Sequence, residues 1–339
     1  MTGDTDNGWL KGIQTYCCKV TVCELVERYI EQKQGMRENT RINYRYVVNI
    51  LKKDPFGARR ITDIRLSDAK RWFAKLQRMG RSYNTIHAIR GIVRPAFQMA
   101  VDDDMILKNP FAFMMSAVVV NDSVARIALT EKQEKAFLDF VRSSPYYAKY
   151  ANAMYVLFHT GLRISEFAGL TIDDIDLKKN LLRVDKQLLR GRDMKCYISK
   201  PKTNSGVRML PFGPDVKRCL QEMILARKIP VKEPVVDGVS GFLCLDIYGR
   251  PAVALHWEHV FKRVWQRYNE THEEKLPLVT PHVCRHTYCT NMARKGINPK
   301  MLQYMMGHSE VGVTLDTYTH IDLQDACEEF ARIEKRKLQ

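Results

Sequence analysis

The stretch Pro281-His282-Val283-Cys284-Arg285-His286-Thr287 says most about the fold and the chemistry of this chain. Pro281 suits the first turn of a helix, so the stretch predicts a helix that begins here. His282 and Arg285 are three residues apart and therefore share one face of that helix. An imidazole next to a guanidinium tends to stay neutral and can accept a proton, and the guanidinium offers a fork of donors to a phosphate. Taken alone, the pair also fits an ordinary solvated helix face.

A second histidine and a tyrosine follow this helix. Gly307-His308-Ser309 comes after the apolar segment from Met301 to Met306, which predicts a helix that Gly307 ends. A histidine just past a helix end can reach a ligand. Ten residues later comes Tyr318. A lone tyrosine usually serves packing, and it needs positive charge nearby to act as a nucleophile, because a free phenol titrates near pH 10.

Two earlier stretches contribute further cations. Thr160-Gly161-Leu162-Arg163 predicts a helix start at Arg163, and Glu166 follows one turn later, where it can hold Arg163 or cap backbone amides. Lys202 lies in Lys200-Pro201-Lys202-Thr203, a turn between two predicted strands, from which an ammonium group can reach into a site. The default interpretations are a surface ion pair and a solvated lysine.

Taken in order, these groups form the pattern Arg, Lys, His-x-x-Arg, His, Tyr. This pattern resembles the tyrosine recombinase (phage integrase) family, and the resemblance covers residues 20–339. Residues 160–170 are similar to the family's first motif box, and residues 281–287 and 306–320 to its second. The phrases TPHVCRHT and YMMGHS are most similar to integrases of conjugative transposons. The resemblance implies a site-specific recombinase for transposon integration and excision.

The resemblance also implies a role for each of these side chains. Arg163 and Arg285 would clamp the phosphate while His308 donates a further hydrogen bond. Tyr318 would attack phosphorus and form a 3′-phosphotyrosyl bond. Lys202 would be the general acid for the leaving 5′-oxygen and His282 the general base for the tyrosine, while Glu166 would support Arg163.

The composition agrees with a nucleic-acid partner. Lys and Arg number 54 against 38 Asp and Glu, a net charge of +16, and the basic excess occurs in both halves of the chain. A basic protein without such a partner is the alternative. Hydrophobic residues make up 45%, enough for folded cores. No apolar run is long enough to span a membrane, residues 1–8 do not form a signal peptide, and the nine cysteines show no CxxC pair. We therefore expect a cytoplasmic, nucleoid-associated protein with reduced thiols.

The expected fold is mainly α with a small antiparallel β-sheet (α+β). We expect a linker at 1–20, a helical core-binding domain at 21–114, an interdomain linker at 115–128, and a catalytic domain with a helical tail at 129–339. Capping boxes are predicted at Thr21 with Glu24 and at Thr130 with Gln133, and simple caps at Ser67 and Ser82. Strands are predicted at 180–189, 195–200 and 207–210, as one antiparallel meander. Integrases of this group usually carry a further arm-binding domain, for which the residues before Thr21 are too few.

Double-stranded DNA with core-type recombination sites is the expected partner. Candidate DNA contacts on the helical domain, each weighed evenly against a solvated helix face, are Arg41, Arg45, Arg81, Asn84 and Arg90. The tail 322–339 carries an apolar stripe at helical spacing, formed by Leu323, Ala326, Cys327, Phe330 and Ile333. The stripe fits packing on its own domain or, as the resemblance favours, docking in trans within a dimer or tetramer on DNA. An accessory excision factor is a further partner consistent with the resemblance.

Three alternatives remain at this point. A type IB topoisomerase shares the tyrosine chemistry but relaxes supercoils without exchanging strands. A regulator would bind DNA without catalysis. Zinc could use His282 with His286 and Cys284 with Cys289, but helical spacing puts Cys284 on another face from the histidines. We expect no metal and no cofactor, because the cations of the proposed reaction are side chains.

Overall fold

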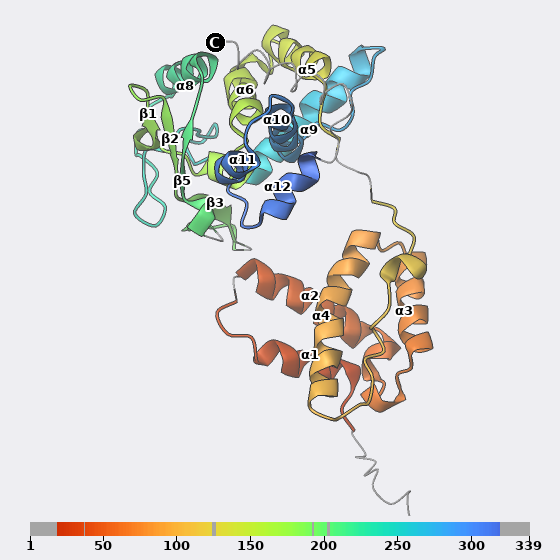
Figure 1. Ribbon diagram of the computed structural model, residues 1–339. Coiled ribbons are helices and arrows are strands. Elements are labelled where there is room, and N and C mark those ends of the chain that lie inside the picture. Colours follow the sequence, from red (N-terminus) through yellow and green to blue (C-terminus); the bar gives the residue numbers. More distant parts are fainter. Residues whose placement is uncertain (1–18, 37, 124–126, 192, 202–203, 319–339) are drawn as a thin grey trace, which may run out of the picture. The chain divides into compact units, whose positions relative to one another are not determined.

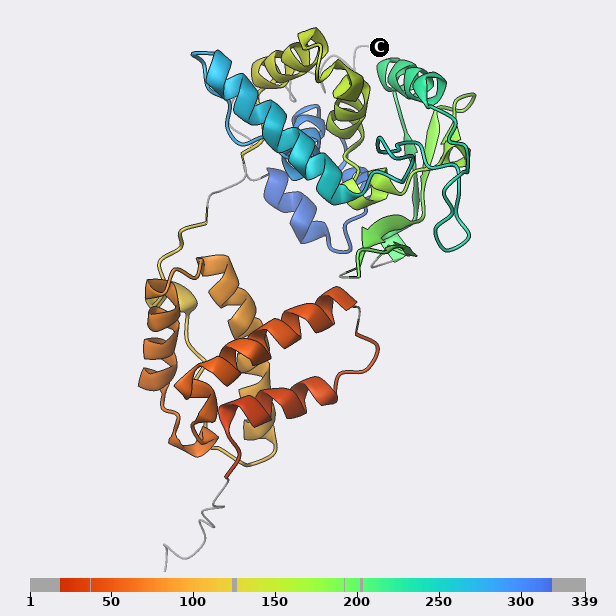
Figure 2. The ribbon, with the colours of Figure 1, turned by 180° about the vertical axis from the view of Figure 1, so that it is seen from behind.

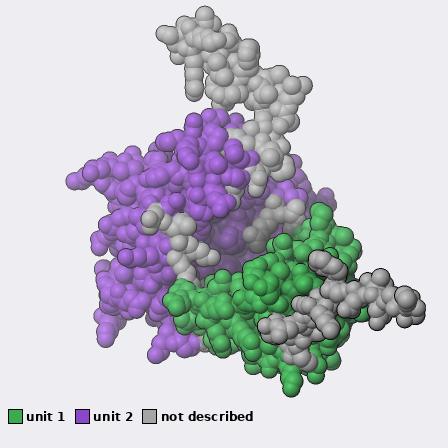
Figure 3. Space-filling model, turned by 60° about the horizontal axis from the view of Figure 1, so that its bottom comes forward, with its two compact units in different colours: residues 1–125 green, residues 126–339 purple. Residues whose placement is uncertain are grey.

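The structure is a computed structural model that describes residues 19–36, 38–123, 127–191, 193–201 and 204–318. Its contacts divide the chain into two compact units, residues 1–125 and 126–339, which Figure 3 colours separately. The described part is mostly helical with small antiparallel sheets, which confirms the predicted fold class. No described helix is both long and apolar enough to cross a membrane.

The first unit is a helical bundle. Its helices are α1 (Val22–Glu31), α2 (Glu38–Lys53), α3 (Leu66–Arg78) and α4 (Tyr83–Asp102), with short 3-10 turns at Pro55–Ala58, Ile61–Asp63 and Met115–Ala117. Apolar faces at helical spacing bury one core, in which Trp72 stacks on Phe56 with ring centroids 4.4 Å apart. Helix α1 packs against α2 and α4 (Figure 1).

Local capping chemistry sets most helix starts of this unit. Thr21 and Glu24 form the predicted capping box, and Ser82 caps α4 as predicted. The predicted cap at Ser67 is wrong. Helix α3 begins one residue before it, at Leu66, and Asp68 accepts the N–H of Arg65 at 3.0 Å. A carboxylate in the first turn satisfies the free amides better than a hydroxyl that lies inside the helix.

The segment that follows α4 is bound to the helical unit over most of its described length. Met115 and Val119 are buried in the same core. The backbone of Val120 makes two hydrogen bonds with the Gln77 amide, at 2.7 and 3.0 Å. Residues 115–120, which the sequence suggested as the start of a linker, therefore belong to the packed helical unit.

The second unit holds the remaining elements. Its helices are α5 (Glu131–Ser143), α6 (Ala151–Thr160), α7 (Ile164–Ala168), α8 (Pro214–Ala226), α9 (Ala254–Thr271), α10 (Pro281–Arg294), α11 (Pro299–Met306) and α12 (Val311–Tyr318). Helix α10 contacts α6, α9, α11 and α12, and Figures 1 and 2 show it between them in the middle of this unit. The predicted helix of residues 281–287 therefore lies at the centre of the second core.

The strands form two separate antiparallel sheets. They are β1 (Ile175–Asp176), β2 (Leu181–Val184), β3 (Gln187–Arg190), β4 (Cys196–Ser199) and β5 (Arg208–Pro211). One sheet has the order β1-β2-β5 and the other pairs β3 with β4, so the single predicted meander is wrong. The predicted strand 180–189 breaks at Asp185-Lys186, because the Lys186 ammonium turns to the buried Asp174 carboxylate at 2.6 Å. Strand β5 consequently pairs with β2 and carries Arg208 into the core.

Candidate active site

Two glycines bring the ends of two helices together. Gly161 ends α6 with φ of 63° and Gly307 ends α11 with φ of 62°, a left-handed conformation that glycine adopts without strain. A Cβ at Gly161 would lie 2.5 Å from the ring of Tyr288 on α10, and one at Gly307 would lie 2.9 Å from Arg208 Nη1. Both positions therefore also require glycine for close packing.

Arg285 links α10 to both of these helix ends. The residue is buried, and it donates Nη1–H to the Gly161 carbonyl at 2.5 Å and Nη2–H to the Met306 carbonyl. Burial and the neighbouring Arg163 and Arg208 lower its pKa to about 9. The guanidinium is thus held among other cations, an environment that an anion would stabilise.

Arg163 makes the reciprocal contact from the other side. It is the residue before α7, and its Nη2–H donates to the Gly307 carbonyl at 2.9 Å. Its Nη1–H donates to Glu166 at 2.7 Å, and its backbone N–H to the same carboxylate at 2.9 Å. The Glu166 side chain is fully buried whereas that of Arg163 is 32% exposed, so the pair is not the surface ion pair of the default interpretation. Part of the Arg163 side chain is therefore accessible to solvent.

Arg208 is a part of this site that the sequence analysis missed. Its side chain is fully buried and donates Nη2–H to Glu166 at 3.0 Å. Burial opposes ionisation of Glu166, but Arg208 and Arg163 outweigh it and lower the pKa of this carboxyl. Among the described residues, the cluster holds three guanidinium groups, of Arg163, Arg208 and Arg285, and one carboxylate, which leaves two net positive charges. The arrangement can bind a phosphodiester and stabilise extra negative charge on it.

His308 lies beside the same cations. It follows Gly307 at the end of α11 and is half-buried, with Nδ1 3.0 Å from the hydroxyl oxygen of Thr314 on α12. Burial, then Arg285 and Arg163, lower its pKa to about 4. The ring is therefore neutral at neutral pH. With Nδ1 turned to Thr314, Nε2 is the ring nitrogen left to meet a ligand, and in the tautomer protonated there it is a donor.

The other predicted catalytic residues are placed to different extents. His282 is exposed in the first turn of α10. Tyr318 is the last residue of α12, and the structure describes only its backbone. The sequence analysis did not predict this helix, which packs against α10 and α11. Lys202 and the tail 322–339 lie outside the described residues. Arg163, Glu166, Arg285 and His308 are thus the predicted residues that the structure brings together.

The candidate DNA contacts on the first unit fall into two groups. Arg41, Arg45 and Asn84 are exposed on α2 and α4. Arg81 donates to the Tyr46 hydroxyl at 2.6 Å, and Arg90 donates to the Phe113 carbonyl at 2.5 Å and lies over its ring. The contacts of Arg90 are those of a residue that fixes the chain after α4.

The zinc alternative has no support in the described geometry. Cys284 is fully buried while His282 on the same helix is exposed, so the two face different environments. Among the described residues, no group of three His, Cys, Asp or Glu side chains has the spacing of a metal site.

Proteins of one family resemble this chain over most of its length. The sequence model of the phage integrase family matches residues 128–325. The transposase of transposon Tn916 from Enterococcus faecalis is 39% identical over 328 residues, which are 97% of this chain and 81% of the transposase. The transposase of transposon Tn1545 from Streptococcus pneumoniae is similar to the same extent.

Solved structures lead to the same family. A structure of the Tn1549 transposon integrase in complex with a circular intermediate DNA has a TM-score of 0.87 at 39% identity, and covers 92% of this chain and 99% of that one. A structure of a lambda integrase tetramer bound to a Holliday junction has a TM-score of 0.60 at 18% identity, and the match covers 89% of this chain and 78% of that one. At this identity the match shows a similar fold. The chain therefore belongs to the phage integrase family and is a tyrosine recombinase, an enzyme that cuts and rejoins DNA strands.

Proposed function

We propose that this recombinase integrates and excises a mobile element by cleaving double-stranded DNA at core-type sites through Tyr318. The observation that carries the proposal is the crossed pair of arginines. Arg163 binds the carbonyl that ends one helix, Arg285 binds the carbonyl that ends the other, and their cluster keeps two net positive charges. Two guanidinium groups at fixed positions match the oxygens of a phosphodiester, which is the substrate group that we propose.

The proposed reaction replaces one phosphate ester by another. The Tyr318 oxygen forms a bond to phosphorus while the bond from phosphorus to the 5′-oxygen breaks, which leaves a 3′-phosphotyrosyl link and a free 5′-hydroxyl. His282 takes the phenol proton, and Lys202 gives a proton to the 5′-oxygen. Because the phosphotyrosyl bond keeps the energy of the phosphodiester, the strand can be rejoined by the reverse steps without a nucleotide cofactor.

The clamp stabilises the transition state rather than the substrate alone. Negative charge grows on the two non-bridging oxygens as phosphorus becomes five-coordinate. Arg163 and Arg285 face this charge with fixed donors, and neutral His308 adds a hydrogen bond through Nε2. The helical unit is proposed to add phosphate contacts from Arg41, Arg45 and Asn84, which would give binding a strong dependence on salt.

A nicked suicide substrate tests the proposal. Cleavage beside the nick releases a short strand that cannot attack back, so a denaturant-resistant protein–DNA adduct accumulates. We expect Tyr318→Phe to abolish the adduct while DNA binding persists. An adduct formed by Tyr318→Phe would show that another residue is the nucleophile. Binding without any adduct in the wild type would favour the regulator, and relaxation without strand exchange the topoisomerase.

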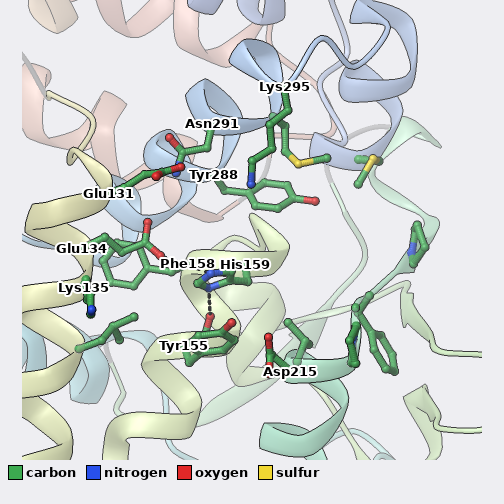
Figure 4. Close-up of a pocket in the computed structure, with 18 of the residues that line it drawn as sticks. Glu131, Glu134, Lys135, Tyr155, Phe158, His159, Asp215, Tyr288, Asn291 and Lys295 are labelled. Carbon is green, nitrogen blue, oxygen red and sulfur yellow. Dashed lines mark hydrogen bonds and ion pairs between the residues drawn. The ribbon is translucent and has the colours of Figure 1, made fainter. Parts of the chain in front are cut away.

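We further propose that the tail 322–339 of one copy docks in a cavity on the neighbouring copy. The cavity of about 650 Å³ lies between α5, α6, α8 and α10 (Figure 4). Its apolar lining comes from Leu138, Phe158, Phe212, Met292 and Met305, and its charged lining holds the cations Lys135, Arg142 and Lys295 beside the carboxylates Glu131, Glu134 and Asp215. The apolar stripe of the tail matches the apolar lining, and Asp325, Glu328 and Glu329 beside the stripe can pair with the cations.

Deletion of residues 322–339 is then expected to weaken cooperative assembly on DNA more than it weakens the binding of one copy. Lys295→Glu in the cavity should do the same, whereas Lys300→Glu on the exposed side of α11 serves as the matched control. A mixture of the tail-deleted chain with the Lys295→Glu chain should assemble better than either alone, because one intact contact can form between them. Oligomerisation on DNA that is unchanged by the deletion would contradict this proposal.

A further inference from the structure

Arg208 is buried in a way that is unusual for an arginine. Its side chain is fully buried on β5, where a guanidinium has to find acceptors inside the protein. Nε–H donates to the Met305 carbonyl at 2.7 Å, and Nη1–H to the Gly206 carbonyl at 2.9 Å. Nη1–H and Nη2–H also donate to the two oxygens of Glu166 at 3.3 and 3.0 Å. One side chain therefore joins α7, α11 and the turn before β5.

Two of these acceptors adjoin the phosphate clamp directly. Glu166 holds the Arg163 guanidinium and its backbone N–H. Met305 precedes Met306 and Gly307, whose carbonyls accept from Arg285 and Arg163 respectively. The close approach of Gly307 to Arg208 leaves no room for a Cβ. A displacement of Arg208 would consequently move the acceptors of both clamp arginines.

Arg208 also controls the charge of the clamp. Without it, the single buried carboxylate of Glu166 would face Arg163 alone, and their charges would cancel. With it, Glu166 is shared between two guanidinium groups. The cluster with Arg285 then keeps two net positive charges instead of one.

We propose that Arg208 is a positioning residue for strand cleavage, which neutralises Glu166 so that Arg163 keeps its charge for the phosphate, and which fixes the end of α11 against α7. This inference rests on the proposed clamp function of Arg163 and Arg285. The Arg208 side chain is fully buried, so it has no exposed atom to offer to DNA. It acts through Glu166 and through the carbonyls of α11.

The test compares two suicide substrates in single-turnover cleavage. One carries the ordinary phosphodiester, and the other a methylphosphonate at the cleavage point, in which a methyl group replaces one charged oxygen. An uncharged phosphorus centre needs less neutralisation, so loss of clamp charge slows the ordinary substrate more than the methylphosphonate. The readout is the ratio of the methylphosphonate rate to the phosphodiester rate, with DNA affinity and thermal unfolding measured for each variant.

We expect Arg208→Met to slow phosphodiester cleavage about 100-fold and to raise the ratio at least about 10-fold, with DNA affinity within about threefold of wild type. Arg208→Lys keeps the charge but loses the fork, so its cleavage should slow while its ratio stays near wild type. Glu166→Gln combined with Arg208→Met removes both charges, and its ratio should return toward wild type.

Arg183 offers a matched control on the neighbouring strand β2. Its Nε–H and Nη2–H donate to the buried carboxylate of Asp174, at 3.0 and 2.9 Å, but no described contact joins it to the clamp. Arg183→Met should leave both rates within about threefold of wild type. If Arg208→Met does not fold, the same rate ratio is measured for Arg208→Gln, whose uncharged side chain can still donate to Glu166.

The outcomes separate this inference from the proposed function. Equal slowing of both substrates by the neutral Arg208 variant, or slowing no greater than that of Arg183→Met, would overturn the role of Arg208. Arg163→Ala provides the reference, since it should raise the ratio whatever Arg208 does. If Arg163→Ala leaves the ratio unchanged, the clamp assignment itself fails.

Discussion

The close approach of Gly307 to Arg208 makes Gly307→Ala an informative substitution. The backbone φ of 62° costs a side-chain-bearing residue about 1–2 kcal/mol. The added Cβ would lie 2.9 Å from Arg208 Nη1 and 3.1 Å from the Ser205 carbonyl oxygen. Because Arg208 is fully buried and held by four hydrogen bonds, we expect about 1–3 kcal/mol more for the overlap, and about 2–5 kcal/mol in total.

Two other glycines separate these contributions to the free energy of unfolding. Gly238 also has a positive φ, of 80°, but a Cβ there would meet nothing within 4 Å, so Gly238→Ala measures backbone strain alone. Gly312 lies inside α12 with open space and no positive φ, so Gly312→Ala should stabilise by about 0.5–1 kcal/mol.

Denaturant unfolding followed by circular dichroism gives the three values, and single-turnover cleavage gives the functional effect. We expect Gly307→Ala to slow cleavage by about 10–100-fold, because its carbonyl holds Arg163. If Gly307→Ala costs no more than Gly238→Ala and cleaves at the wild-type rate, the cluster around Arg208 yields easily, and our account of a rigid clamp is wrong.

Two further predictions concern charge. Burial raises the pKa of Glu134 to about 7, so the folded protein loses stability as pH rises from about 4.5 to about 7, and the penalty is complete above that range. Glu134→Gln should therefore match wild type near pH 4 and be more stable by about 1–3 kcal/mol at pH 8, with the exposed Glu258→Gln measured as the control. Arg163→Lys keeps its charge but loses the planar fork that binds Glu166 and the Gly307 carbonyl through separate nitrogens, so cleavage should fall about 100-fold while DNA affinity, measured by electrophoretic shift, changes less than about threefold.

The features that could be predicted from the sequence are those that depend on residues close together in the chain. The capping box at Thr21 and the end of α11 at Gly307 involve side chains and backbone within one or two turns, and both occur in the structure. The family pattern likewise marked Arg163, Arg285 and His308, and the spacing after Arg163 marked Glu166. Such features need no knowledge of tertiary packing.

Features that depend on distant partners were missed. Arg208 on β5 resembles any polar residue of an exposed strand, and its partner Glu166 lies 42 residues earlier in the chain. The sequence suggested Arg90 as a DNA contact, whereas in the structure its guanidinium donates to the Phe113 carbonyl. The break between β2 and β3 depends on the Asp174 carboxylate, which folding brings to Lys186. Burial of each of these charges is decided by tertiary contacts that no local pattern contains.

The identity of the nucleophile is the central claim, and peptide mapping of the suicide adduct tests it most directly. Digestion with nuclease and trypsin should leave a nucleotide on the peptide of residues 301–332, which contains both Tyr304 and Tyr318. Fragmentation in the mass spectrometer then assigns the added mass to one of them. We predict a nucleotide on Tyr318, while Tyr304, whose hydroxyl oxygen accepts the Met209 N–H at 3.1 Å, stays unmodified. A nucleotide on Tyr304 or on any other residue would contradict the account.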